Sequence, residues 1–385
     1  MLRPSSIKPF HVMDILARCK TMQAQGRDII HMEIGEPDFP APQPIMDAGI
    51  AALHKQQTYY TSAQGLPELR AAISQDYLAR FNCQVEAGQI FITPGASGAI
   101  QLVFGYILQA RKTLMIGDPT YPCNRNVAQL FNANIEAVAV DEHCDFQLGL
   151  EAIKNHWHED IAAVLIASPS NPTGTVSEKH ELLEIADFLA GKGSVLIVDE
   201  IYQGLNYDTT PSSVAGLRDN IFVINSFSKY FGMTGWRIGW CVAPKAYISS
   251  LDAIAQNTYL ASSTPAQFAA LAAFQQDTFA IVEQRRVIFQ QRRDLICDAL
   301  SDLPLHVPCI PQGAFYIYAN VAAVSDDSFK FCQQLLESTG VAVTPGCDFG
   351  DHRAQQYIRF AYTNSEQRLH EGMTRLKVFC DGINS

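Results

Sequence analysis

The chain has 385 residues, of which 48% are hydrophobic and 17% are charged, and its formal net charge is -11. This length exceeds that of a typical single core, so we expect two domains that share a cleft. The acidic balance and the lack of a basic run argue against nucleic acid or an anionic membrane as the partner and favour small-molecule ligands. Charges recur through the first thirty residues, so we expect no signal peptide, no membrane span and a cytoplasmic protein.

The sequence predicts no metal site. The ten cysteines are scattered and form no CxxC pair, so neither a zinc knuckle nor a disulfide framework fits, and we expect reduced, mostly buried thiols. The stretch HWHED at residues 156–160 combines histidines with carboxylates. A polar helix end or loop explains this stretch better than a metal cluster does.

Short apolar runs rich in β-branched residues alternate along the chain with longer amphipathic segments, which predicts an α/β fold. The runs are apolar throughout, so they suit a mostly parallel central sheet covered by helices on both faces. A ligand should then lie beyond the carboxyl ends of the strands. The predicted strands are QIFIT near residue 90, TLMIGD near 115, IEAVAV near 137, AAVLIA near 164, VLIVDE near 197, IFVIN near 223 and IGWCVA near 240.

The pattern changes after about residue 285. A charged helix, EQRRVIFQQRRDLICDAL, is followed by GAFYIYANV, by a second helix near 328–339 and by YIRFAYTNS. These segments predict a smaller α+β domain over residues 286–385, to which residues 1–40 contribute as an N-terminal arm. Residues 41–285 then form the large domain that carries the ligand site.

Several polar residues lie at the predicted strand ends. The stretch TPGASGAIQLVF follows a strand and opens a helix, so the backbone of Gly95, Ala96 and Ser97 can attract a phosphate, although a plain glycine turn explains it equally well. Asp199 ends the apolar run VLIVD, where a buried carboxylate needs a partner: a helix cap, a structural ion pair or a protonated ligand nitrogen.

Two further stretches are ambiguous when each is taken alone. Asn171 lies in SPSNPTG, which is first of all a turn signature. Lys229 lies in SFSKYFGMTGWRIG, between serines and aromatic residues, and Arg237 follows it by eight positions. An exposed surface position is the usual fate of a lysine, and a reactive amine is the alternative.

Taken in order along the chain, these motifs resemble the class I and II aminotransferases, which are pyridoxal-phosphate enzymes of fold type I. The resemblance covers almost the whole chain and implies the fold-type I α/β architecture. It rests on EIGEPDF at residues 33–39, YTSAQGLPELR at 60–70, TPGASGA at 93–99, GDPTYP at 117–122, SPSNPTG at 168–174, VDEIY at 198–202, SFSKYFGMTGWRIG at 226–239 and IRFAYTNS at 358–365.

The resemblance implies pyridoxal 5'-phosphate as the cofactor. Lys229 would bind it covalently and then act as a general base, and Asp199 would keep its ring nitrogen protonated. Asn171 and Tyr202 would donate hydrogen bonds to its phenolic oxygen, and Tyr121 would stack on its ring. The phosphate would be held by Gly95, Ala96, Ser97, Ser226 and Arg237, and by Tyr60 of a second subunit in a homodimer.

By the same resemblance, Arg359 would hold the α-carboxylate of the substrate, helped by Gly35 and Asn171. The implied reaction moves an amino group from an α-amino acid to a 2-oxo acid by a ping-pong cycle. Ser97 stands where one aspartate-acting branch of the family has a lysine, so an apolar, aromatic or broad-range donor remains open. Two alternatives also remain: a C–S or β-elimination lyase that uses the same cofactor, and a non-catalytic ligand-binding domain.

Overall fold

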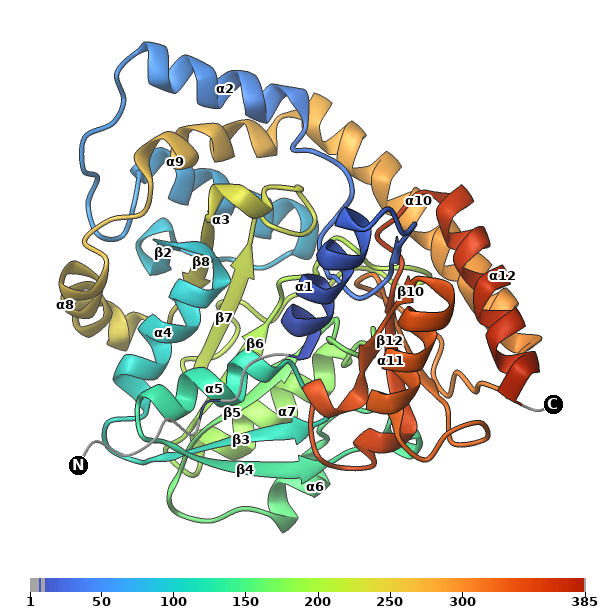
Figure 1. Cartoon of the computed structure of the whole chain (residues 1–385). Coiled ribbons are helices and arrows are strands. Elements are labelled where there is room, and N and C mark those ends of the chain that lie inside the picture. Colours follow the sequence, from blue (N-terminus) through green and yellow to red (C-terminus); the bar gives the residue numbers. More distant parts are fainter. Residues whose placement is uncertain (1–6, 8–10, 384–385) are drawn as a thin grey trace, which may run out of the picture.

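The computed structural model describes residue 7 and residues 11–383 (Figure 1). Its centre is a seven-stranded sheet in the order β2-β8-β7-β6-β5-β3-β4. Strand β8 is antiparallel to both of its neighbours, and the other strands run parallel, so the mostly parallel sheet is confirmed. The strands are β2 (Ile90–Thr93), β3 (Thr113–Asp118), β4 (Asn134–Ala139), β5 (Ile161–Ala167), β6 (Val195–Asp199), β7 (Ile221–Ser226) and β8 (Gly239–Val242).

The inner strands are apolar throughout because both faces of the sheet are covered. Along β6, Leu196 and Val198 belong to one core cluster and Val195 and Ile197 to the other, as the alternation of side chains along a strand requires. Strand β4 lies at the edge and is largely exposed, so the expectation of burial on both faces is wrong for this strand. The helices associated with this sheet are α2 (Gln43–His54), α3 (Pro67–Phe81), α4 (Gly95–Ile107), α5 (Pro122–Leu130), α6 (Leu150–Asn155), α7 (Lys179–Ala190), α8 (Ile248–Thr258) and α9 (Thr264–Leu271).

The rest of the chain forms two small sheets with their own helices, on the right of Figure 1. One sheet has the antiparallel order β11-β12-β9, and the other pairs β1 with β10 in parallel. The N-terminal strand therefore joins the C-terminal part of the chain. The elements are α1 (His11–Ala24), β1 (Ile30–His31), α10 (Gln276–Ser301), β9 (Tyr316–Asn320), α11 (Ser328–Thr339), β10 (Val341–Ala342), β11 (Thr344–Pro345), β12 (Tyr357–Ala361) and α12 (Glu366–Ile383).

Helix α10 is continuous through residue 285, so the predicted boundary between residues 285 and 286 falls inside a helix, and the domain limits stay a prediction. Short 3-10 helices complete the connections at Ala87–Gln89, Glu142–Cys144, Thr234–Trp236, Lys245–Tyr247, Ala272–Phe274, Gly346–Asp348 and Ala354–Gln356.

All ten cysteines are free thiols, but only half of them are fully buried, and Cys144 and Cys347 are exposed. The expectation of mostly buried thiols is therefore only partly met. HWHED lies at the end of α6 and in the turn that follows, as the polar-helix-end interpretation predicts. Within the described part of the chain, no helix is long and apolar enough to cross a membrane.

Candidate active site

A cavity of about 780 Å³ lies where the carboxyl ends of β5, β6 and β7 face the small three-stranded sheet. Parallel strands bring their carboxyl ends to one edge, so residues far apart in the sequence meet there. Except for Gly95 and Tyr60, every predicted site residue lines this cavity. The lining includes Gly35, Ala96, Ser97, Tyr121, Asn171, Asp199, Tyr202, Ser226, Lys229, Arg237 and Arg359.

Lys229 and Asp199 supply an amine and a carboxylate to the same cavity. Burial lowers the pKa of the Lys229 amine to about 8, although the Glu36 carboxylate opposes the shift. Its Nζ donates a hydrogen bond to the carbonyl oxygen of Gly35 at 2.7 Å. Burial raises the pKa of the Asp199 carboxyl to about 6, against the hydrogen bond that the backbone N–H of Ile201 donates to its Oδ1 at 3.1 Å. No described residue forms an ion pair with either group.

A second group of residues surrounds the N-terminus of helix α4. The helix begins at Gly95, whose φ of +71° favours glycine, and a Cβ added there would collide with the guanidinium of Arg237. Arg237 donates from Nη1 to the carbonyl oxygen of Thr234 at 2.9 Å. Free backbone N–H groups, a guanidinium and the nearby hydroxyls of Ser97 and Ser226 together suit a phosphate dianion.

The third group is centred on Arg359, which β12 places across the cavity. This side chain is buried and donates from Nη1 to Oδ1 of Asn171 at 2.8 Å, and from Nη2 to the carbonyl oxygen of Glu33 at 2.5 Å and to Oγ1 of Thr344 at 3.3 Å. Its buried Nε–H has no hydrogen-bond partner among the residues that the structure describes. A buried donor without a partner is costly, so this edge of the guanidinium suits an incoming carboxylate.

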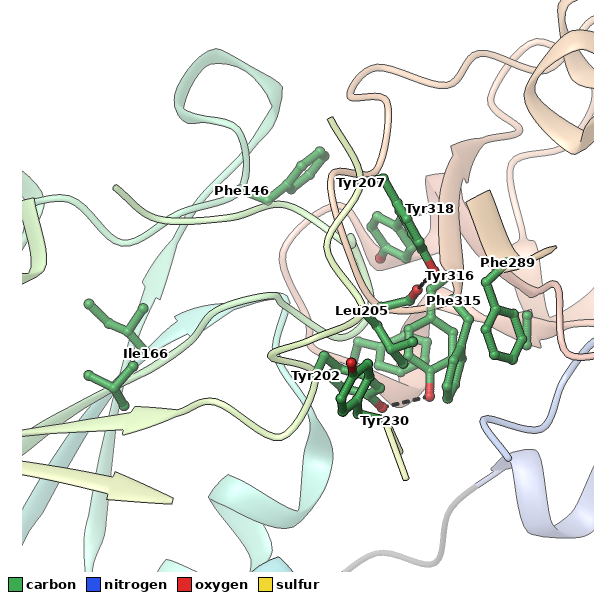
Figure 2. Close-up of a cluster of buried hydrophobic side chains, with 14 of the residues drawn as sticks. Phe146, Ile166, Tyr202, Leu205, Tyr207, Tyr230, Phe289, Phe315, Tyr316 and Tyr318 are labelled. Atoms are coloured by element: carbon green, nitrogen blue, oxygen red, sulfur yellow. Dashed lines mark hydrogen bonds between the residues drawn. The ribbon is translucent and has the colours of Figure 1, made fainter. Parts of the chain in front are cut away.

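The structure also brings in residues that the sequence did not single out. Tyr316 lines the cavity from β9 and forms a hydrogen bond between its hydroxyl and that of Tyr202 at 2.8 Å (Figure 2). The hydroxyl of Ser228 lies 2.9 Å from that of Ser226. Ser228 is next to Lys229, in a stretch that the family motifs include. Tyr316 lies in GAFYIYANV, whose composition is that of an ordinary strand and does not indicate a site residue.

Tyr60 lies apart from the cavity of its own chain. Its side chain is 82% exposed, and it lies in the segment between α2 and α3. Gly95 is absent from the cavity lining but contacts Arg237, which does line it. Within one subunit the structure thus gathers all the predicted site residues except Tyr60.

The class of protein follows from comparison with known families. The family model for aminotransferases of class I and II matches residues 27–376. The chain therefore belongs to the class I and II aminotransferases, and it is a transferase enzyme of fold type I.

Named relatives agree with this assignment. A valine–pyruvate aminotransferase of Mycobacterium tuberculosis is 33% identical over 97% of this chain and 96% of that protein. A probable aspartate/prephenate aminotransferase of Aquifex aeolicus is 34% identical over 97% of each chain. The crystal structure of an aminotransferase from Mycobacterium tuberculosis has a TM-score of 0.95 at 32% identity, over 99% of this chain and 100% of that chain.

The family uses pyridoxal phosphate, and the residues present fit that group. The lack of a side chain at Gly95 lets the Arg237 guanidinium approach the N-terminus of α4, and a guanidinium at a helix N-terminus suits a phosphate. The buried carboxylate of Asp199 lacks the cation that a protonated ring nitrogen would supply, and Lys229 offers an amine in the same cavity.

Proposed function

We propose that this aminotransferase binds pyridoxal 5'-phosphate in the cavity and moves the amino group of an α-amino acid to a 2-oxo acid by a ping-pong cycle. The bound cofactor would supply a carbonyl carbon that takes the amino group and a ring that withdraws electrons from the substrate. Its phosphate would lie on Gly95, Ala96, Ser97, Ser226 and Arg237. Its ring would lie among Tyr121, Asn171, Asp199 and Tyr202.

Lys229 is the proposed base. Burial lowers the pKa of this amine to about 8 in the chain without cofactor and so favours its neutral form. Once the substrate has displaced Nζ from the cofactor, Nζ would accept the substrate's α-proton and return it. Asp199 would keep the ring nitrogen protonated, and pairing with this protonated nitrogen would offset the cost of burying the Asp199 carboxylate. Arg359 would orient the substrate through its carboxylate, helped by Asn171 and Gly35.

The observation that carries the proposal is a buried amine and a buried carboxylate in one cavity, faced by an arginine. Among residues 7 and 11–383 the carboxylate has no ion-pair partner, and the Nε–H of the arginine has no acceptor. The test uses the fact that an aminotransferase completes half of its cycle without an acceptor. Single amino acids added to the pure holoenzyme should convert its absorbance to that of the pyridoxamine form and release one equivalent of 2-oxo acid per site. Steady ammonia release with the original absorbance retained would support the lyase instead, and a spectrum that no amino acid changes would support the binding domain.

We also propose that the preferred donor carries an uncharged side chain. Val12, Met13, Ile100 and Phe349 give the cavity an apolar wall, and the carboxylate of Glu36 lies on the same cavity. The side-chain carboxylate of an acidic donor such as aspartate would lose its hydration against this apolar wall and gain no hydrogen bond or ion pair in return. At least one aromatic or aliphatic donor should therefore react no worse than aspartate in the half-reaction, and a clear preference for aspartate would refute this assignment.

We propose further that the enzyme is a homodimer in which Tyr60 reaches the phosphate in the partner's site. Three large apolar side chains of α2, those of Met46, Ile50 and Leu53, are between 37% and 58% exposed, and Tyr59 is 80% exposed beside Tyr60. A group of exposed apolar side chains on one element is typical of a protein interface. Figure 1 places α2 at the outer edge of the molecule, where a second subunit can reach it.

Subunit mixing tests this arrangement. Hybrid dimers of a Tyr60→Phe chain and a Lys229→Ala chain should contain one intact site and one doubly impaired site. Activity should therefore rise above that of the Tyr60→Phe parent once the subunits have exchanged. No gain after confirmed exchange would mean that Tyr60 acts in its own subunit or not at all.

A further inference from the structure

Tyr316 lies where the cofactor and substrate sides of the proposed site meet. It is the first residue of β9, it is 1% exposed, and its side chain lines the cavity. Its ring and its hydroxyl touch different members of the proposed site. The family motifs in the sequence assign this residue no role.

The ring of Tyr316 supports Arg359. The guanidinium carbon lies 4.2 Å from the centroid of the Tyr316 ring and 4.8 Å from that of Phe349. In the antiparallel register Arg359 pairs with Tyr318, so Tyr316 is its diagonal neighbour on the adjacent strand. A guanidinium held against aromatic rings gains cation–π attraction and loses rotational freedom. The free Nε–H therefore keeps a fixed direction.

The hydroxyl of Tyr316 shares one hydrogen bond with the hydroxyl of Tyr202, and either oxygen can donate in it. The two phenolic oxygens lie 2.8 Å apart, in a cluster of packed aromatic rings that Figure 2 shows. Burial raises the pKa of both phenols, so both carry their protons at neutral pH. One hydrogen bond between two hydroxyls uses only one of the two protons, and the direction of that bond decides which proton is left over.

The left-over proton has chemical consequences. If Tyr202 donated to Tyr316, its own proton would not be available to a ligand oxygen in the cavity. If Tyr316 donates, the Tyr202 proton is free to point into the cavity, and a hydroxyl that accepts one hydrogen bond is a stronger donor of another.

The backbone at Gly35 lies close to the Tyr316 hydroxyl. A Cβ added at Gly35 would overlap the hydroxyl oxygen, so the glycine allows the close approach. The carbonyl oxygen of Gly35 accepts the hydrogen bond from Lys229 Nζ at 2.7 Å. The same short segment thus contacts both Tyr316 and the proposed base.

We propose that Tyr316 is a positioning residue with two separable functions: its hydroxyl donates to Tyr202 and directs the Tyr202 proton into the cavity, and its ring holds the guanidinium of Arg359 in place for the substrate carboxylate. This inference rests on the proposed function, since it assigns Tyr202 to the cofactor and Arg359 to the substrate. The two functions call for two variants. Tyr316→Phe removes only the hydroxyl, and Tyr316→Leu also removes the ring.

The hydroxyl is tested by a pH titration of the visible absorbance of the holoenzyme. Tyr316→Phe should move the midpoint in the same direction as Tyr202→Phe but by less, and the double variant should move it no further than Tyr202→Phe alone. The control is Tyr318→Phe, a buried tyrosine two residues along the same strand that stacks on Tyr357, and it should leave the midpoint unchanged. An unmoved midpoint in Tyr316→Phe, or fully additive shifts, would overturn the role of the hydroxyl.

The ring is tested by calorimetric binding of 3-phenylpropionate, a monocarboxylate without an amino group, to the holoenzyme. Tyr316→Phe should bind it within about twofold of the wild type, and Tyr316→Leu about 30-fold more weakly, as expected for the loss of one buried cation–π contact. Wild-type affinity in a folded Tyr316→Leu protein, or equal losses in both variants, would overturn the role of the ring. A wild-type holoenzyme that titrates normally but reacts with no amino acid would instead refute the proposed function.

Discussion

Replacing Asp199 with asparagine should stabilise the enzyme without cofactor and weaken its hold on the cofactor. A carboxyl pKa raised from 3.8 to about 6 means that the folded apoenzyme resists ionising this group. The raised pKa corresponds to about 3 kcal/mol of lost stability at pH values well above 6. Asparagine keeps an oxygen that can accept the N–H of Ile201 and removes the charge.

The sign of the pH dependence follows from the same pKa values. Between pH 4 and pH 6 the folded state binds more protons than the unfolded state, so the wild-type apoenzyme loses stability as the pH rises. The Asp199→Asn variant does not lose stability in this way, because asparagine does not ionise. The difference in unfolding free energy should therefore be about 1.5 kcal/mol at pH 5 and about 3 kcal/mol at pH 8, in favour of Asp199→Asn.

Urea unfolding of the two apoenzymes at equal protein concentration measures this difference. In the holoenzyme the sign should reverse, because the asparagine cannot pair with a protonated ring nitrogen, and cofactor affinity should fall at least about tenfold. A stability difference that does not change between pH 5 and pH 8 would refute the argument from an unpaired buried carboxylate. Unchanged cofactor affinity would refute the assignment of Asp199 to the ring nitrogen.

Three further substitutions test other parts of the site. Lys229→Ala should retain bound cofactor but lose turnover by about three orders of magnitude or more. Lys245→Ala, a control at an exposed lysine, should keep normal turnover. Near-normal turnover in Lys229→Ala would show that Lys229 is not the base. Arg359→Gln should lower kcat/KM for all amino acids by a similar factor, about 100-fold, because Arg359 is proposed to bind the carboxylate that they share; unequal factors in a donor panel would contradict this. Gly35→Ala should destabilise the fold by about 1–3 kcal/mol because its Cβ overlaps the Tyr316 hydroxyl, and Gly88→Ala, which has open space, should not; thermal unfolding compares the two.

The order of strands and helices could be predicted because their signals are local. Apolar runs of strand length, separated by amphipathic segments, reflect burial on two faces, and every predicted strand of the large sheet is present. The exposure of β4 could not be foreseen, since IEAVAV does not show which strand lies at the edge. The change in sequence pattern near residue 285 also predicted a domain boundary there, although α10 continues through that position.

Site residues were predictable where a motif surrounds them and unpredictable where only packing selects them. Lys229 and Asp199 lie in stretches whose letters match a family pattern, and the structure brings both to one cavity. Tyr316 lies in a strand of ordinary composition, and only the approach of β9 to Tyr202 and Arg359 distinguishes it from Tyr318 on the same strand.

The sequence by itself determined the α/β class, the family and the chemical types gathered at the strand ends, because each depends on residues close together in the chain. The tertiary structure alone decided which of those groups meet. Arg359 donates to Asn171 across 188 positions, and Glu33 accepts from Arg359 across 326. Burial in the shared cavity then shifts the pKa of Lys229 down and that of Asp199 up, which no local pattern encodes because both shifts depend on the removal of water by distant segments.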